Sequence, residues 1–165
     1  MRGVHMIDPL DARILLTLDR DPQATVLSLS RELGVARNTI HARLRRLLTD
    51  GSLGPFSQRV RNESLGLPLI GFISIAISQS ASHEATEHLR RIPEIIEMHA
   101  TTGEADLLAK VAAKDPADLH RITNLMLSIE GVVRTSTAMS LVEVMPTRTL
   151  PLLESVARSG GAGGT

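Results

Sequence analysis

Residues 29–47 read LSRELGVARNTIHARLRRL, which predicts a short helix, a turn at Gly34-Val35 and a second helix. In the second helix Ile40, Leu44 and Leu47 recur at spacings of four and three, so they share one apolar side. The opposite side carries an amide, an imidazole and several guanidinium groups. This arrangement is typical of a helix-turn-helix, whose second helix reads the major groove of DNA.

The polar side of the second helix supplies the candidate DNA contacts. Asparagine pairs bidentately with adenine and arginine with guanine, while other arginines hold phosphates. We expect Arg37, Asn38 and His41 to approach base edges and the later arginines to hold phosphate. The full candidate set is Arg37, Asn38, Thr39, His41, Arg43, Arg45, Arg46 and Arg59. The alternative is a solvated, arginine-rich helix in which Arg46 merely pairs with Asp50 one turn later.

The charge of the chain is unevenly distributed along its length. The 165 residues have a net charge of zero, yet residues 1–62 hold ten arginines against six carboxylates, so the remainder is equally acidic. Every basic residue before position 63 is arginine, the side chain whose planar fork matches phosphate and guanine. A basic first third joined to an acidic remainder indicates that only the first part meets nucleic acid.

Composition narrows the class of partner and excludes several chemistries. The chain has no Trp or Tyr and only two Phe, whereas RNA and single-strand binders stack bases on aromatic side chains, so we expect double-stranded DNA. It has no Cys, which excludes disulfides, thiolate catalysis and Cys-ligated zinc. The six His are scattered without ligand spacing, and we expect neither a metal site nor a cofactor.

The hydrophobic segments indicate no contact with a membrane. The longest apolar run, residues 67–77, is interrupted by Pro68, Gly71 and Ser74 and is too short to span a bilayer. No signal-peptide pattern is present, and we expect a cytoplasmic protein.

The pattern predicts an α+β protein of two parts. Residues 1–62 are expected to form an N-terminal winged helix-turn-helix, in which a strand from Phe56 to Val60 forms the wing. Arg59 and Arg61 on that wing either reach a flanking phosphate or stay solvated. Residues 63–68 read as a linker and residues 69–148 as a second domain. Residues 149–165 read as a tail, whose glycine-rich end, 160–165, is expected to be disordered.

The second domain alternates strand and helix in the order β-α-β-β-α-β. This order predicts a ferredoxin-like sheet with both helices on one face. The strand over residues 69–77 is apolar on both of its faces, because Ile73 and Ile75 alternate with Phe72 and Ala76. A free-standing sheet would wet its open face, so we expect a second subunit to cover it and the protein to be a homodimer.

Several segments, in this order and spacing, resemble the Lrp/AsnC (feast/famine) family of transcriptional regulators. Residues 7–15, IDPLDARIL, look like that family's opening "Leu-Asp-x-x-Asp-x-x-Ile-Leu", and residues 29–35 look like its second helix and turn. Residues 43–47 with 50–53 look like the exit of its reading helix, and residues 103–108, GEADLL, like its "Gly-Asp-x-Asp-Tyr-x-Leu" turn. The resemblance covers roughly residues 7–148. It implies dimers, often assembled into octamers, and a small effector, usually an amino acid, held between C-terminal domains near that turn.

Three positions depart from the family pattern. Ala36 replaces the usual serine at the start of the reading helix, which predicts a weaker N-cap. Ala105 and Leu107 stand where aromatic residues are common, so we expect an enlarged or altered effector pocket.

The effector site is expected around the Gly103 turn. Glycine permits close backbone approach, free amide groups there can receive a carboxylate, and Asp106 or Glu104 offers a charge for an ammonium group. The candidate residues are Thr101, Thr102, Gly103, Glu104, Asp106, Thr135 and Thr137. One alternative is an ordinary hairpin turn that binds no ligand. Another is an acid/base pair, but no nucleophile or metal ligand set accompanies it, so we expect no catalytic residues.

The resemblance leaves two other functions of the same build open. One is an enzyme similar to the sirohaem decarboxylases, and the other is a stand-alone amino-acid-binding module. The intact basic helix favours a sequence-specific, effector-responsive transcriptional regulator over both.

Overall fold

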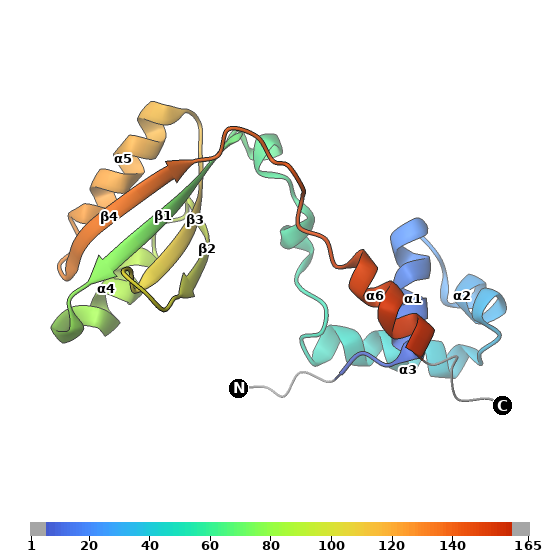
Figure 1. The fold of residues 1–165 in the computed structure, drawn as a ribbon. Coiled ribbons are helices and arrows are strands. Elements are labelled where there is room, and N and C mark those ends of the chain that lie inside the picture. The colour runs from blue at the N-terminus through green and yellow to red at the C-terminus, as the bar shows by residue number, and fades with distance from the viewer. Residues whose placement is uncertain (1–5, 160–165) are drawn as a thin grey trace. The chain divides into compact units, whose positions relative to one another are not determined.

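The computed structural model describes residues 6–159, and these form two compact units (Figure 1). The first unit comprises residues up to Gln58 together with the segment from Met145 onward. The second unit is Arg59–Val144. The chain therefore leaves the first unit once and returns to it. The glycine-rich end, for which disorder was expected, lies outside the described residues.

The first unit contains the predicted trihelical core. Its helices are α1 (Pro9–Arg20), α2 (Val26–Leu33) and α3 (Arg37–Thr49). Asp8 caps α1, Thr25 caps α2, and Gly34 ends α2 in the left-handed conformation with φ of 66°. One buried residue from each helix forms the centre of the core, namely Ile14, Leu29 and Ile40. As predicted from Ala36, no side chain caps the start of α3.

The structure corrects two expectations about the ends of this unit. The predicted wing strand is absent among the described residues, since Phe56–Arg59 and Asn62–Leu65 form short 3-10 helices. A lone strand there would have no neighbouring strand to satisfy its backbone groups. The predicted tail contains a helix, α6 (Leu150–Ser159), which packs against α1 (Figure 1).

The second unit has the predicted ferredoxin-like topology. Its elements are β1 (Leu69–Ile77), a 3-10 turn (Gln79–Ala81), α4 (Ser82–Leu89), β2 (Ile95–Ala100), β3 (Leu107–Ala113), α5 (Pro116–Leu127) and β4 (Val132–Met139). All neighbouring strands are antiparallel, in the order β2-β3-β1-β4. Both helices cover the same face, where they bury side chains such as Leu89 and Ile122.

Strand β1 runs through the centre of this unit. Its side chains at Ile73 and Ile75 are fully buried under the helices. A Cβ at Gly71 would lie 2.7 Å from Leu119 Cδ1, so the glycine allows α5 to approach the sheet closely. Phe72 points to the opposite face and is 40% exposed. The open face of the sheet is thus partly apolar, as the sequence predicted.

A bulge in β2 changes which of its side chains face the core. Ile95 and Glu97 pair with the consecutive residues Val111 and Lys110, which leaves Ile96 as an extra residue. Ile95 and Met98 therefore pack against the core, whereas Ile96 is exposed.

Across the described part of the chain, no helix is both long enough and apolar enough to cross a membrane.

Candidate DNA-binding surface and small-molecule cavity

The outer side of α3 presents polar groups to solvent. Arg37, Asn38, His41 and Arg45 are all exposed, and within residues 6–159 none of their side chains forms a hydrogen bond or ion pair. Thr39 is also exposed. Ile40 and Leu47 on the other side of α3 are buried, which fixes the rotation of the helix about its axis. These four side chains of the predicted DNA-binding set are therefore outward-facing and available to a ligand.

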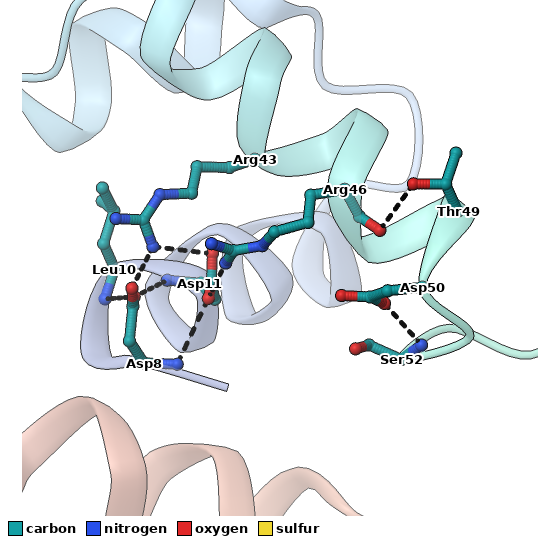
Figure 2. Close-up of polar contacts among 8 residues, drawn as sticks. All are labelled: Asp8, Leu10, Asp11, Arg43, Arg46, Thr49, Asp50 and Ser52. Carbon is teal, nitrogen blue, oxygen red and sulfur yellow. Dashed lines mark hydrogen bonds and ion pairs between the residues drawn. The ribbon is translucent and has the colours of Figure 1, made fainter. Parts of the chain in front are cut away.

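Two other arginines of α3 face α1 instead of solvent. Asp11 is fully buried, and its carboxylate accepts from Arg43 Nη1 at 3.0 Å and from Arg46 Nη2 (Figure 2). Arg43 also pairs with Asp8 at the start of α1. The backbone N–H of Asp8 donates to Asp11 as well, at 3.2 Å. This group of four residues, Asp8, Asp11, Arg43 and Arg46, is called the α1–α3 charge cluster below.

The charge cluster favours the ionised form of Asp8. Partial burial acts to raise the pKa of Asp8, but the hydrogen bond from the Asp11 backbone and the guanidinium of Arg43 outweigh it, so the pKa lies below its ordinary value. Carboxylates paired in this way attach the reading helix to α1 by charge-assisted hydrogen bonds.

The cluster corrects part of the predicted DNA surface. Arg43 and Arg46 were expected to hold phosphates, but their guanidinium groups are engaged with α1. The alternative interpretation, in which Arg46 pairs with Asp50, is also wrong, because Arg46 pairs with Asp11. Arg59 lies in a 3-10 helix in place of a wing, and Arg61 pairs with Glu63 at 3.3 Å. The wing argument for Arg59 and Arg61 therefore fails.

The turn between β2 and β3 is closed by its own hydrogen bonds. Thr101 donates from its hydroxyl to the carbonyl of Ala105 at 3.0 Å and from its backbone N–H to the carbonyl of Asp106 at 2.9 Å. Gly103 has a φ of 118°, a conformation that other residues rarely adopt. Asp106 accepts from the backbone N–H of Ile77 at 2.7 Å. Its carboxylate fastens the turn to β1, and of the two acidic candidates for an ammonium group only Glu104 lines the cavity described next.

A cavity of about 380 Å³ opens beside this turn on the open face of the sheet. It is lined by Ser74, Ala76, Thr101, Thr102, Glu104, Ala105, Leu108, Arg134 and Ser136. Arg134 and Glu104 carry opposite charges, and within the described residues neither forms an ion pair or a side-chain hydrogen bond. A volume of this size holds a small molecule, and the two charges suit a zwitterion.

The cavity contains only part of the predicted effector set. Thr101, Thr102 and Glu104 line it, whereas Thr135 and Thr137 do not. These two pair with Ile75 and Ile73, whose side chains lie on the helix-covered face, and the Thr137 hydroxyl lies 3.3 Å from that of Thr123. Strand alternation therefore brings their neighbours Arg134 and Ser136 to the cavity.

The two family departures near the turn also differ in their effect. Ala105 lines the cavity, where its small side chain leaves space, as expected. Leu107 is instead buried in the core under the helices, so it does not alter the cavity. Within residues 6–159 no group of three or more His, Asp or Glu is placed to hold a metal ion.

Both units match known families. Residues 7–48 match the AsnC-type helix-turn-helix domain, and residues 70–150 match the Lrp/AsnC ligand binding domain. The HTH-type transcriptional regulator FL11 of Pyrococcus furiosus is 33% identical over 152 residues, covering 92% of this chain and 99% of that protein. The FL11 protein of Pyrococcus horikoshii is 32% identical over 146 residues, covering 88% and 97%. These relatives are named as transcriptional regulators and not as enzymes.

Solved structures agree with this assignment. E. coli AsnC superimposes with a TM-score of 0.79 at 26% identity, covering 89% of this chain and 100% of AsnC. A transcriptional regulator of Neisseria meningitidis, solved as a complex with L-Met, superimposes with a TM-score of 0.75 at 27% identity, covering 89% and 97%. The chain is therefore a DNA-binding transcriptional regulator that belongs to the Lrp/AsnC family.

Proposed function

We propose that this regulator binds double-stranded DNA sequence-specifically as a homodimer and that an amino acid bound in the Arg134 cavity modulates the binding. The observation that carries the effector part is the pair of unoccupied, opposite charges, Arg134 and Glu104, in one cavity. Arg134 receives the carboxylate and Glu104 the ammonium group. The L-Met complex of the Neisseria relative supports the same class of ligand. Because its target is chromosomal DNA, we place the protein in the cytoplasm.

The effector acts by preferring one arrangement of the protein. A ligand shifts an equilibrium only by its difference in affinity for the two states. Such coupling is typically about 1–3 kcal/mol, or roughly 5- to 150-fold in DNA affinity. A gel-shift titration of the promoter beside its own gene, with and without each of the twenty amino acids, tests this. If no amino acid changes the DNA affinity, modulation by amino acids is wrong.

On the DNA side, Asn38 is proposed to read a base and Arg45 to hold a phosphate. Asn38→Ala is expected to cost about 1–3 kcal/mol on the operator and to relax specificity at one position, because a bidentate base contact is lost. Arg45→Ala is expected to weaken all sequences alike and to lower the slope of log K against log salt by about 1. Binding to operator and random duplexes over a salt series measures both.

Arg13→Ala is the control, because Arg13 is an exposed arginine of α1 whose side chain forms no hydrogen bond or ion pair in the described residues. Arg13→Ala should leave both the affinity for DNA and the slope of log K against log salt unchanged. An equal loss on operator and random DNA for Asn38→Ala would remove its assigned role.

The dimer is proposed to form through the open face of the sheet. Phe72 and Leu108 are 40% and 36% exposed there, on neighbouring strands. Phe72→Glu is expected to give a monomer at micromolar concentration in sedimentation velocity, since a carboxylate in an apolar interface loses its hydration. Leu125→Glu on α5, where the leucine is 43% exposed, is the matched control and should stay dimeric. A dimeric Phe72→Glu protein would place the interface elsewhere. Further assembly to an octamer rests on family resemblance alone.

A further inference from the structure

Helix α6 lies beyond the residues that match the two family models. The match to the ligand-binding domain ends at residue 150, where α6 (Leu150–Ser159) begins. The carbonyl of Thr149 accepts from the backbone N–H groups of Leu152 and Leu153, at 3.0 and 3.1 Å, and so starts the helix. The segment is a helix with its own hydrogen bonds, and it belongs to the first unit and not to the second unit that precedes it.

Helix α6 packs on α1 through one defined stripe (Figure 1). Leu153, Val156 and Ala157 are half-buried at spacings of three and one, which places them on the same side of the helix, whereas Leu152 is 67% exposed. On α1, Ala12 is fully buried although it lies on the side opposite the trihelical core. A small residue at that position lets a second helix approach closely.

Because α6 belongs to the first unit, the chain passes between the two units twice. The second passage ties the units together through the packing of α6 on α1. The chain crosses between them at Gln58–Arg59 and again at Val144–Met145. A domain held by one flexible linker samples many orientations, whereas closing a second connection removes much of that freedom. The second connection exists only while α6 stays packed on α1.

This restriction matters for a dimer that reads two half-sites. Two-site binding gains affinity only when both DNA-binding units reach their half-sites at once. Two half-sites lie on the same side of the duplex when they are separated by about 10–10.5 bp, one helical turn, or by a multiple of it. Resting on the dimeric function proposed above, we propose that Leu153 and Val156 are positioning residues for DNA recognition. By holding α6 on α1 they fix the half-site separation that the dimer accepts.

The test compares DNA probes that differ in half-site separation. Duplexes selected from a random pool by the wild-type protein are lengthened between their half-sites by about 5 bp, half a helical turn, or about 10 bp, a full turn. The wild type is expected to lose about 10²-fold in affinity on the half-turn probe, which is the gain from simultaneous binding. The Leu153→Glu/Val156→Glu protein is expected to lose no more than a few-fold. Leu152→Glu, on the exposed side of α6, should behave like the wild type.

Two further measurements distinguish a positioning role of Leu153 and Val156 from a general disruption of the DNA-binding unit. Affinity for a single half-site should be equal in all proteins, because α3 is untouched. Hydrogen exchange over residues 150–159 should be fast in the double variant and slow in Leu152→Glu. If the double variant fails to fold, Ser155→Pro undocks α6 by a second route, since proline in a helix interior removes a hydrogen bond and Ser155 is exposed.

The outcomes distinguish this inference from the function on which it rests. If α6 is undocked and the half-turn penalty of the wild type persists, the inference is wrong while the dimeric function stands. The same holds if the wild type dimerises and selects DNA but shows no dependence on separation. If the wild type neither dimerises nor selects DNA, the inference and the proposed dimeric function are both wrong.

Discussion

Replacing both arginines of the charge cluster, as Arg43→Met/Arg46→Met, is expected to destabilise the DNA-binding unit by about 3–5 kcal/mol, the cost of leaving a buried charge without a partner. Asp11 is fully buried, and its carboxylate is held by these two guanidinium groups. Methionine preserves much of the side-chain volume and helix propensity, so the loss comes from the uncompensated carboxylate. For a unit of this size the melting temperature should fall by at least about 10 °C.

Hydrogen exchange by mass spectrometry of the full chain measures this effect in each unit separately. Amides of α1–α3 should lose protection, whereas those of β1 and β3 should keep it, because the two units have separate cores. Arg45→Met is the matched control, since Arg45 is exposed on the same helix.

A third variant tests whether the unpaired Asp11 carboxylate causes the loss of stability. Asp11→Leu/Arg43→Met/Arg46→Met removes the fully buried carboxylate together with its two arginine partners and leaves only Asp8, which is partly exposed. Replacing a buried ion group by apolar residues is often neutral or stabilising. We expect it to recover most of the lost stability. A double variant within about 1 kcal/mol of the wild type would show that the cluster is not what attaches α3 to α1.

The cluster also explains why the sequence predicted the reading helix well and its arginines less well. The apolar spacing of Ile40, Leu44 and Leu47 fixes a buried side, and that side is as predicted. Arg43 and Arg46, however, lie at its margins, where an arginine can turn outward to DNA or inward to a carboxylate. The partner, Asp11, is 32 residues away from Arg43 in sequence, so only the packing of α1 on α3 decides between the two.

The effector site shows the same limit for strands. The Gly103 turn was predictable. The residues that β4 contributes to the cavity, however, depend on the register in which β4 pairs with β1, because adjacent residues of a strand face opposite sides of the sheet. Over residues 132–139, VVRTSTAM, polar side chains occur at both parities, so no alternation favoured Arg134 over Thr135. Pairing of Arg134 with Ala76 settles it.

Helix α6 differs from these cases, because a signal for it was present. Leu150, Leu153 and Ala157 recur at three and four, Thr149 precedes them, and Pro151 lies in the first turn. The glycines from Gly160 onward favoured a tail over a helix for the whole segment.

Reversing the cavity charge, as Arg134→Glu, is expected to abolish measurable amino-acid binding. Loss of a hydrogen bond to a charged group costs about 1.5–3 kcal/mol, or roughly 10- to 150-fold in affinity, and truncation to alanine should give a loss in that range. Reversal adds repulsion of the ligand carboxylate by a second carboxylate beside Glu104, which lines the same cavity. Its effect should therefore exceed that of alanine.

Calorimetry with the twenty amino acids identifies the ligands of the wild type, and the tightest of them is then titrated into each variant. Arg91→Glu is the matched control, because Arg91 is exposed directly after α4, away from the open face of the sheet, and does not line the cavity. It makes the same change in net charge, so general electrostatic repulsion would affect both variants equally. Glu104→Gln should weaken amino acids but not simple carboxylic acids, since only the former carry the ammonium group assigned to Glu104. If Arg134→Glu and Arg91→Glu bind the amino acid alike, the carboxylate is received elsewhere, and the backbone amides of the Gly103 turn become the remaining candidates.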